Sequence, residues 1–120
     1  MLKTDDKPLE AEYSYFFVGN ESTEYILTIS GFTGIYDCMA DKTDKSANAN
    51  GMKFSTIDVD NDPLGGSCAA ICHSGWWFHS CTRGNLNGLF GIEKTFSVMR
   101  WTCADGRICP LKATRILLRI

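Results

Sequence analysis

Acidic side chains and glycines are concentrated in one short stretch near the middle of the chain. Asp58, Asp60 and Asp62 alternate along the sequence, and Pro63 and two glycines follow within four residues. A tight turn of this kind can direct backbone carbonyls toward a hard cation such as calcium, while carboxylates neutralise its charge. Aspartates that cap their own backbone in a solvated turn explain the spacing equally well, so both interpretations remain open.

An EF-hand calcium loop also opens with alternating acidic residues, but the residues after these aspartates exclude one here. The position that requires glycine is Pro63, and the position that requires a bidentate glutamate is Ala69. Any calcium site in this stretch therefore has a different geometry.

Six cysteines in 120 residues indicate an oxidising compartment, because small extracellular domains compensate for a small core with disulfides. A catalytic thiol at Cys72 with His73 or His79 as base is not favoured, since sequence neighbours seldom face each other productively. The sequence has no G-x-S-x-G, H-E-x-x-H or phosphate-binding glycine motif, and its Cys and His spacings fit no zinc site. We therefore expect a protein that is not an enzyme.

Length and charge limit the classes of protein to which this chain can belong. The chain is long enough for one small domain, and its formal charge of −2 gives no electrostatic basis for binding nucleic acid or an anionic membrane. No segment approaches the length of a membrane span, and the residues that follow Met1 do not have the apolar h-region of a signal peptide. Asn20-Glu21-Ser22 is an N-glycosylation sequon, which predicts an exposed turn in a secreted protein.

Most of the elements that would position the acidic stretch are predicted to be strands. Residues 13–18 and 25–30 are rich in aromatic and β-branched side chains, and the sequon lies in their connection. Residues 101–103 and 108–112 flank Asp105-Gly106, a strong hairpin signal.

Other segments carry weaker signals. Residues 52–54 predict a short strand and residues 115–120 a closing strand. Residues 1–10 are expected to be loosely held, and residues 41–51 are the segment most prone to disorder. No amphipathic helix is evident, so we expect at most one or two short helical turns.

The order of motifs in this sequence resembles the fibrinogen C-terminal domain family. The motifs are G-M-K-F-S-T, D-V-D-N-D, C-A, G-W-W and N-L-N-G, all between residues 51 and 88. Residues 13–34 and 101–120 are also similar to the family, so the resemblance covers nearly the whole chain. It implies an α+β fold, a small antiparallel β-sheet with long calcium- and disulfide-organised loops. Residues 1–120 would then be a partial domain whose N-terminal subdomain is absent.

The same resemblance implies specific site residues. Calcium would be held by the side chains of Asp60 and Asp62 and by the backbone carbonyls of Leu64 and Gly66. Cys68 and Cys81 correspond to a disulfide of the family, and closing this loop stabilises the fold by roughly 3 kcal/mol. The family has no equivalent of Cys103 and Cys109, which could pair across the hairpin. Cys38 and Cys72 also depart from the family pattern, and they either pair or remain free.

Family members bind ligands beside the calcium loop, which points to one group of residues here. The predicted ligand-binding residues are Trp77, His79, Thr82, Arg83 and Arg107. Trp76 and Trp77 could instead belong chiefly to the core, because adjacent tryptophans dominate the apolar burial of a small domain.

The function implied by the resemblance is non-catalytic recognition in the extracellular space. The main expectation is a secreted, lectin-like glycoprotein of innate immunity that binds glycans or acetylated groups with the support of calcium. The alternative is a fibrinogen-like module that binds a peptide or protein. A third reading is a degenerate domain without binding activity, since the usual histidine after the second cysteine of the disulfide is Thr82 here.

Overall fold

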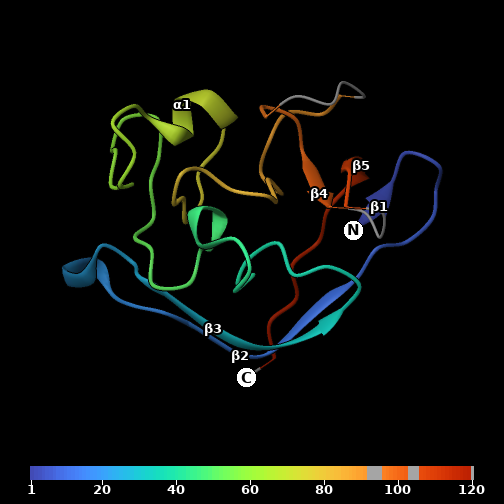
Figure 1. Cartoon of the computed structure of the whole chain (residues 1–120), viewed down its shortest axis with the longest axis horizontal. Helices are drawn as coiled ribbons and strands as arrows, with labels where there is room; N and C mark the ends of the chain where they lie inside the picture. The colour runs from blue at the N-terminus through green and yellow to red at the C-terminus, as the bar shows by residue number, and fades with distance from the viewer. Residues whose placement is uncertain (92–95, 103–105, 120) are drawn as a thin grey trace.

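The computed structural model of the protein describes residues 1–91, 96–102 and 106–119. Figure 1 shows a long two-stranded hairpin along one side of the molecule, with an extended loop region lying against it. A small three-stranded sheet lies at the end of the molecule that carries the N-terminus. This arrangement confirms the predicted α+β fold with small antiparallel sheets and long loops.

Both sheets are antiparallel. β1 (Leu2–Lys3), β5 (Ile108–Ala113) and β4 (Arg100–Thr102) form the three-stranded sheet in the order β1-β5-β4. β2 (Ala11–Val18) pairs with β3 (Leu27–Gly34) to form the hairpin. The two hairpins predicted from the sequence are therefore present.

The hairpin of β2 and β3 follows from alternating side chains. In β3, Leu27 and Ile29 are buried while Thr28 and Ser30 are exposed, as expected of a strand with one face on the core. Gly31 has a φ of 72°, and a β-carbon there would lie 1.7 Å from the hydroxyl oxygen of Ser14 in the paired strand. Only glycine satisfies both conditions without strain.

The loop region contains three short helical segments. These are the 3₁₀-helices η1 (Glu21–Thr23) and η2 (Lys45–Ala47) and the α-helix α1 (Cys68–Cys72). Among the described residues, no helix is long and apolar enough to cross a membrane.

The segment predicted to be prone to disorder, residues 41–51, is anchored to the core. Ala47 and Ala49 are buried, and Ala49 N donates to Met39 O at 2.7 Å. Just before this segment, one oxygen of Asp37 accepts hydrogen bonds from the Tyr13 hydroxyl at 2.6 Å and from the backbone of Ala40 at 2.8 Å. The prediction was wrong because a polar composition does not report these long-range contacts.

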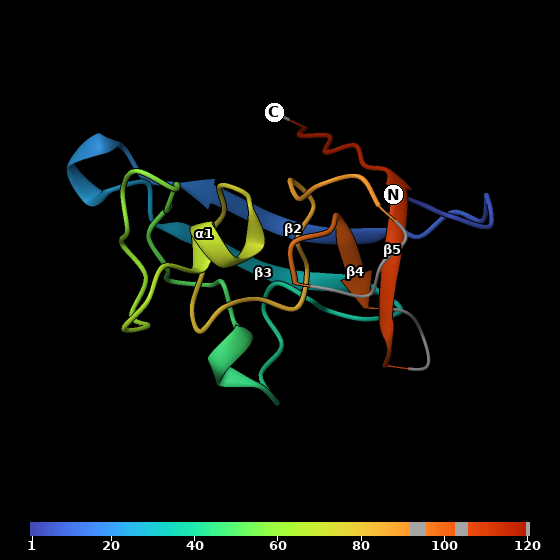
Figure 2. The ribbon, with the colours of Figure 1, turned by 90° about the horizontal axis from the view of Figure 1, so that it is seen from above.

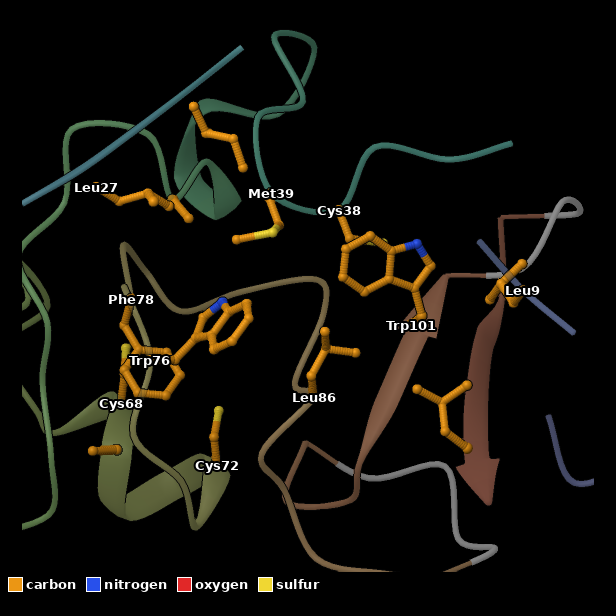
Figure 3. Packing of buried hydrophobic residues seen from close by; sticks show 14 residues of the cluster. Leu9, Leu27, Cys38, Met39, Cys68, Cys72, Trp76, Phe78, Leu86 and Trp101 are labelled. Atoms are coloured by element: carbon orange, nitrogen blue, oxygen red, sulfur yellow. The ribbon is translucent and has the colours of Figure 1, made fainter. Parts of the chain in front are cut away.

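The core lies between the hairpin, α1 and β4. Figure 3 shows Trp76 and Phe78 close to Leu27 and Met39, with Trp101 beside Cys38. Burying one large apolar residue completely contributes about 1.5–3 kcal/mol, so this cluster dominates the stability of a domain of this size. The remaining members of the cluster are Leu9, Ile29, Ala49, Cys68, Ala69, Cys72, Leu86 and Leu111.

Three local predictions are corrected by the structure. Residues 1–10 are not loosely held, because β1 pairs with β5 and Leu9 is buried. Residues 52–54 form no strand, although Met52 O accepts a hydrogen bond from Leu27 N at 3.0 Å. Residues 114–119 form no strand with the described residues, and Ile116, Leu117 and Leu118 are exposed. An apolar sequence indicates strand propensity but does not supply a pairing partner.

Candidate binding site

The acidic loop, defined here as residues 58–66, is held at its base by a pair of backbone hydrogen bonds. Ser55 N donates to Trp76 O at 2.9 Å, and Trp76 N donates to Ser55 O at 3.1 Å. Asn61 closes the loop onto this base, because its backbone N donates to Ser55 Oγ and its side-chain Nδ2 donates to Phe54 O, both at 2.9 Å. A mostly exposed loop therefore rises from a buried, hydrogen-bonded base.

Asp62 connects the acidic loop to α1. Its two carboxylate oxygens accept hydrogen bonds from Leu64 N at 2.9 Å and from Cys68 N at 3.0 Å. Its own backbone N donates to the Asp60 carboxylate at 3.2 Å, which brings the two acidic residues together. Partial burial raises the pKa of Asp62, and the adjacent Asp60 raises it further. A bound cation would relieve this unfavourable proximity of two carboxylates.

The predicted Cys68–Cys81 disulfide is present at the start of α1. The S–S distance is 2.07 Å and the two Cα atoms are 5.4 Å apart, within the usual range for a disulfide. The helix begins where Ser67 Oγ accepts a hydrogen bond from Ala70 N at 3.2 Å, a typical N-cap contact. The peptide bond between Ser80 and Cys81 is cis. The disulfide thus joins the helix after the acidic loop to the segment that carries the predicted ligand residues.

Cys38 and Cys72 are buried free thiols. Burial raises the pKa of Cys38 to about 11, and its sulfur accepts a hydrogen bond from Thr102 N at 3.2 Å. Burial also raises the pKa of Cys72, although the adjacent Arg100 opposes this effect. Both thiols are therefore protonated and poorly reactive at neutral pH. Of the two readings left open by the sequence, the structure supports free cysteines.

The hairpin of β4 and β5 carries three further predicted residues. Cys103 lies outside the described residues, so its pairing with Cys109 stays a prediction. Cys109 is half-buried in β5, where it is the register partner of Trp101 in β4. Arg107 is exposed immediately before β5. The structure therefore places Arg107 at the surface next to β5, which lies at the opposite end of the molecule from residues 58–66.

Asn85 is a fully buried hydrogen-bonding centre behind the site. Its side-chain oxygen accepts a hydrogen bond from Ser74 Oγ at 2.6 Å. Its backbone pairs with that of Arg100: Asn85 N donates to Arg100 O at 2.9 Å, and Arg100 N donates to Asn85 O at 3.1 Å. Its side-chain nitrogen lies within hydrogen-bond distance of three carbonyl oxygens, those of Cys72, Phe96 and Val98. Sequence reasoning noted the N-L-N-G motif but did not identify this role.

Arg100 is a second buried polar residue that the sequence did not single out. It is 1% exposed, and it donates hydrogen bonds to the carbonyl oxygens of Thr82, at 3.1 Å, and Phe96. Burial lowers the pKa of Arg100, but a guanidinium remains charged in proteins. Through these carbonyls and the neighbouring Cys72, Arg100 ties β4 to α1 and to the segment that follows the disulfide.

Trp76 and Trp77 both contribute to packing. Trp76 is buried, whereas Trp77 is half-buried and donates from its indole nitrogen to Tyr25 O at 2.8 Å. The Trp77 ring packs edge-on against Phe54 at 5.1 Å and Phe16 at 6.2 Å between ring centroids. These contacts agree with the alternative that the tryptophan pair belongs chiefly to the core, and they fix the indole of Trp77 in place.

The other predicted ligand residues have different surroundings. Thr82 is buried, and its hydroxyl donates to Gly84 O at 2.7 Å. Arg83 is half-buried and forms an ion pair with Asp44 at 2.9 Å. His79 is half-buried, and its Nδ1 lies 3.1 Å from Ser80 Oγ. The hydroxyl of Thr82 and the guanidinium of Arg83 are thus engaged within the protein, and His79 retains a partly accessible ring.

The donor atoms of the acidic loop fit a hard divalent cation. Asp60 and Asp62 supply carboxylates within one turn, where Asp62 N donates to the Asp60 carboxylate, and the carbonyls of Leu64 and Gly66 follow in an exposed stretch. In the described part of the protein, no group of three or more Asp, Glu, His or Cys residues could bind a metal ion. A site in this loop would therefore combine two carboxylates with backbone oxygens, which is a typical calcium donor set.

A separate cleft lies beside β3. It has a volume of about 480 Å³ and lies between the hairpin and the loop that follows β3. Its lining residues are Tyr13, Ile29, Ser30, Gly31, Phe32, Asp37, Ala40, Asp41, Lys42, Asn48 and Asn50. None of the predicted ligand residues lines it.

Comparison with known proteins gives a consistent result. Residues 1–119 match the family described as fibrinogen beta and gamma chains, C-terminal globular domain. The fibrinogen gamma chain of Mus musculus is 43% identical over 96 residues, which is 72% of this chain and 22% of that protein. Angiopoietin-4 of Bos taurus is 33% identical over 113 residues, which is 91% of this chain and 22% of that protein. The chain thus spans about a fifth of the length of these relatives.

Solved structures show the same fold. The fibrinogen-like globe domain of human ANGPTL6 has a TM-score of 0.77 and 26% identity, and the match covers 92% of this chain and 50% of that one. The lamprey fibrin D-dimer, solved with the peptide ligand Gly-His-Arg-Pro-amide, has a TM-score of 0.67 and 26% identity. That match covers 98% of this chain and 45% of the lamprey chain.

Proposed function

Because the protein belongs to the family of C-terminal globular domains of fibrinogen beta and gamma chains, we propose that it is a non-catalytic module that binds a peptide or protein outside the cell. The observation that carries this proposal is the family match over residues 1–119. A structurally similar relative, the lamprey fibrin D-dimer, was solved with a peptide ligand. The Cys68–Cys81 disulfide supports a secreted, oxidising location.

The architecture of the acidic loop supports the same proposal. An exposed loop that rises from a rigid base is a common position for a recognition site. Asn61 and the backbone pairing of Ser55 with Trp76 hold the base, and the disulfide holds the adjacent helix. We place the partner surface at this loop and at the neighbouring, partly accessible His79. Arg107 lies next to β5, at the opposite end of the molecule, and is not part of this surface.

Calcium is the cofactor that we propose for this site. Asp60 and Asp62 would hold the ion with the carbonyl oxygens of Leu64 and Gly66. Bound calcium would neutralise the two carboxylates and restrict the turn. The loop would then be preorganised, which lowers the entropic cost of binding a partner.

The lectin-like reading of the sequence has less support than the peptide-binding alternative. The relatives described above are a fibrinogen chain and an angiopoietin, and the ligand in the lamprey structure is a peptide. In addition, the hydroxyl of Thr82 and the guanidinium of Arg83, both expected to contact a small polar ligand, have partners inside the protein. We therefore favour binding of a peptide, and we test binding of a glycan as the alternative hypothesis.

A titration monitored by backbone amide NMR tests this function. The probe is Gly-His-Arg-Pro-amide in about 10 mM calcium, a concentration well above the dissociation constants of about 0.1–1 mM that are usual for extracellular calcium modules. The matched control is the reversed tetrapeptide. We expect saturable shifts confined to the acidic loop and to residues 76–83, and no such shifts with the control. N-acetylglucosamine is added in a parallel titration.

The outcomes separate the three readings. Saturable shifts with the sugar and none with the peptide would overturn the proposal in favour of a lectin. No response to either probe from a folded, calcium-loaded protein would favour a degenerate domain.

A further inference from the structure

The connection between β2 and β3 carries a candidate modification site. We propose that Asn20 is N-glycosylated, with the glycan at the tip of the long hairpin. Asn20-Glu21-Ser22 is the only N-x-S/T sequence in the protein. Glycosylation of asparagine requires the sequon to be at the protein surface, and the structure meets this condition, since all three residues are exposed.

The side chain of Asn20 is well placed for attachment. Its amide oxygen accepts a hydrogen bond from the Ser22 hydroxyl at 2.5 Å, so the hydroxyl and the acceptor amide of the sequon lie together. The backbone oxygen of Asn20 accepts hydrogen bonds from Thr23 N and Tyr25 N, both at 3.1 Å. The turn is thus held by the backbone, and Nδ2 makes no hydrogen bond to the described residues.

The sequon itself lies outside the core, as a modifying enzyme requires when it binds a sequon in its active site. η1 contains no buried residue. Glu24 and Tyr25, which follow it, both have a φ of 59°, in the left-handed region that disfavours residues with a side chain. Both residues are nevertheless held to the body of the protein, since Glu24 O accepts a hydrogen bond from Phe54 N at 3.1 Å and Tyr25 O accepts one from Trp77 Nε1 at 2.8 Å. Local opening is therefore confined to residues 20–23.

The chemistry of attachment is a glycosyl transfer from an oligosaccharide carried on a lipid diphosphate. The Nδ2 atom of Asn20 forms a bond to C1 of the first sugar and loses one proton. The bond between C1 and the diphosphate oxygen breaks, and the lipid diphosphate leaves with the electron pair. No oxidant or reductant is needed.

A glycan at this position would also restrict how partners approach. Figures 1 and 2 place η1 and the acidic loop at the same end of the molecule, opposite the end with β1 and β5. A bulky, hydrated glycan keeps the hairpin tip in solvent. The tip is therefore not part of a tightly packed interface with another domain or subunit.

Translation of the full protein behind a cleavable secretory leader, in the presence of microsomal membranes, tests the proposal. Gel mobility and intact mass are compared before and after treatment with peptide N-glycosidase. We expect one glycan on the wild-type protein, none on Asn20→Gln or Ser22→Ala, and one on Ser22→Thr. As a matched control, adding Leu89→Ser to the Asn20→Gln variant creates a new sequon at the exposed Asn87 and should restore one glycan.

Removal of the leader reports translocation independently of glycosylation. A wild-type protein that loses its leader but shows no mass change with the glycosidase would overturn the proposal. A mass change that persists in the Asn20→Gln variant would overturn it as well, because the modification would then lie elsewhere.

Discussion

Replacing Asn85 with alanine is expected to lower the free energy of unfolding by about 3 kcal/mol. The amide side chain is fully buried, accepts a hydrogen bond from Ser74 and donates to the carbonyls of Cys72 and Val98. Alanine would leave these groups buried without their partner, and each unsatisfied group costs about 1–3 kcal/mol. The contacts also set the position of α1 relative to β4, so the loss should extend to the candidate site.

The matched control is Asn87→Ala, two residues further along the same motif. Asn87 is exposed and donates one hydrogen bond, from Nδ2 to Gly75 O at 3.0 Å. Its replacement should cost less than about 1 kcal/mol, because water can satisfy the exposed carbonyl. Urea unfolding followed by tryptophan fluorescence measures both variants. Equal losses for the two would show that Asn85 is not the centre of the network.

Removing the Cys68–Cys81 disulfide with a double alanine substitution is expected to cost about 3 kcal/mol. The two cysteines are 13 residues apart, and the bond restricts this loop in the unfolded state. In the folded protein it also fixes the start of α1, where Cys68 N donates to Asp62. The variant should therefore lose stability and also show a smaller response to calcium.

Cys72→Ala is the control for this experiment. Cys72 is buried at the other end of α1 and is a free thiol, so its truncation removes a sulfur without opening a loop. A loss of about 1 kcal/mol is expected, from packing and from the contact with Arg100. If the variant without the disulfide is as stable as this control, the covalent bond contributes nothing beyond the packing of the two cysteine side chains.

Much of the framework could be predicted from the sequence, because it depends on local patterns. The alternation of Leu27 and Ile29 with polar residues indicates a half-buried strand, and Asp105-Gly106 indicates the turn between β4 and β5. The predictions that failed concern segments whose structure depends on contacts with residues far away in the sequence. Residues 114–119 are apolar enough for a strand, but they form no strand pairing with the described residues.

The candidate site was harder to predict, because the sequence shows which side chains are present but not which of them already have hydrogen-bond or ion-pair partners inside the protein. The sequence suggests a ligand-binding side chain at Arg83, yet this residue pairs with Asp44, which is 39 residues away. Asn85 and Arg100 are polar residues that the fold buries, and no local pattern distinguishes them from surface residues. Only the acidic loop, whose residues are close in sequence, could be located directly.

We propose that residues 58–66 form a calcium-binding loop that prepares the domain for a partner. The most direct test is thermal unfolding of the oxidised protein in about 10 mM calcium or in EDTA, with Asp60→Ala/Asp62→Ala as the control. For dissociation constants of about 0.1–1 mM, calcium should add about 1.4–2.7 kcal/mol of stability and raise the Tm by several degrees. This increase should be absent in the double variant. A cooperative transition of the wild-type protein at the same temperature in calcium and in EDTA would contradict the claim.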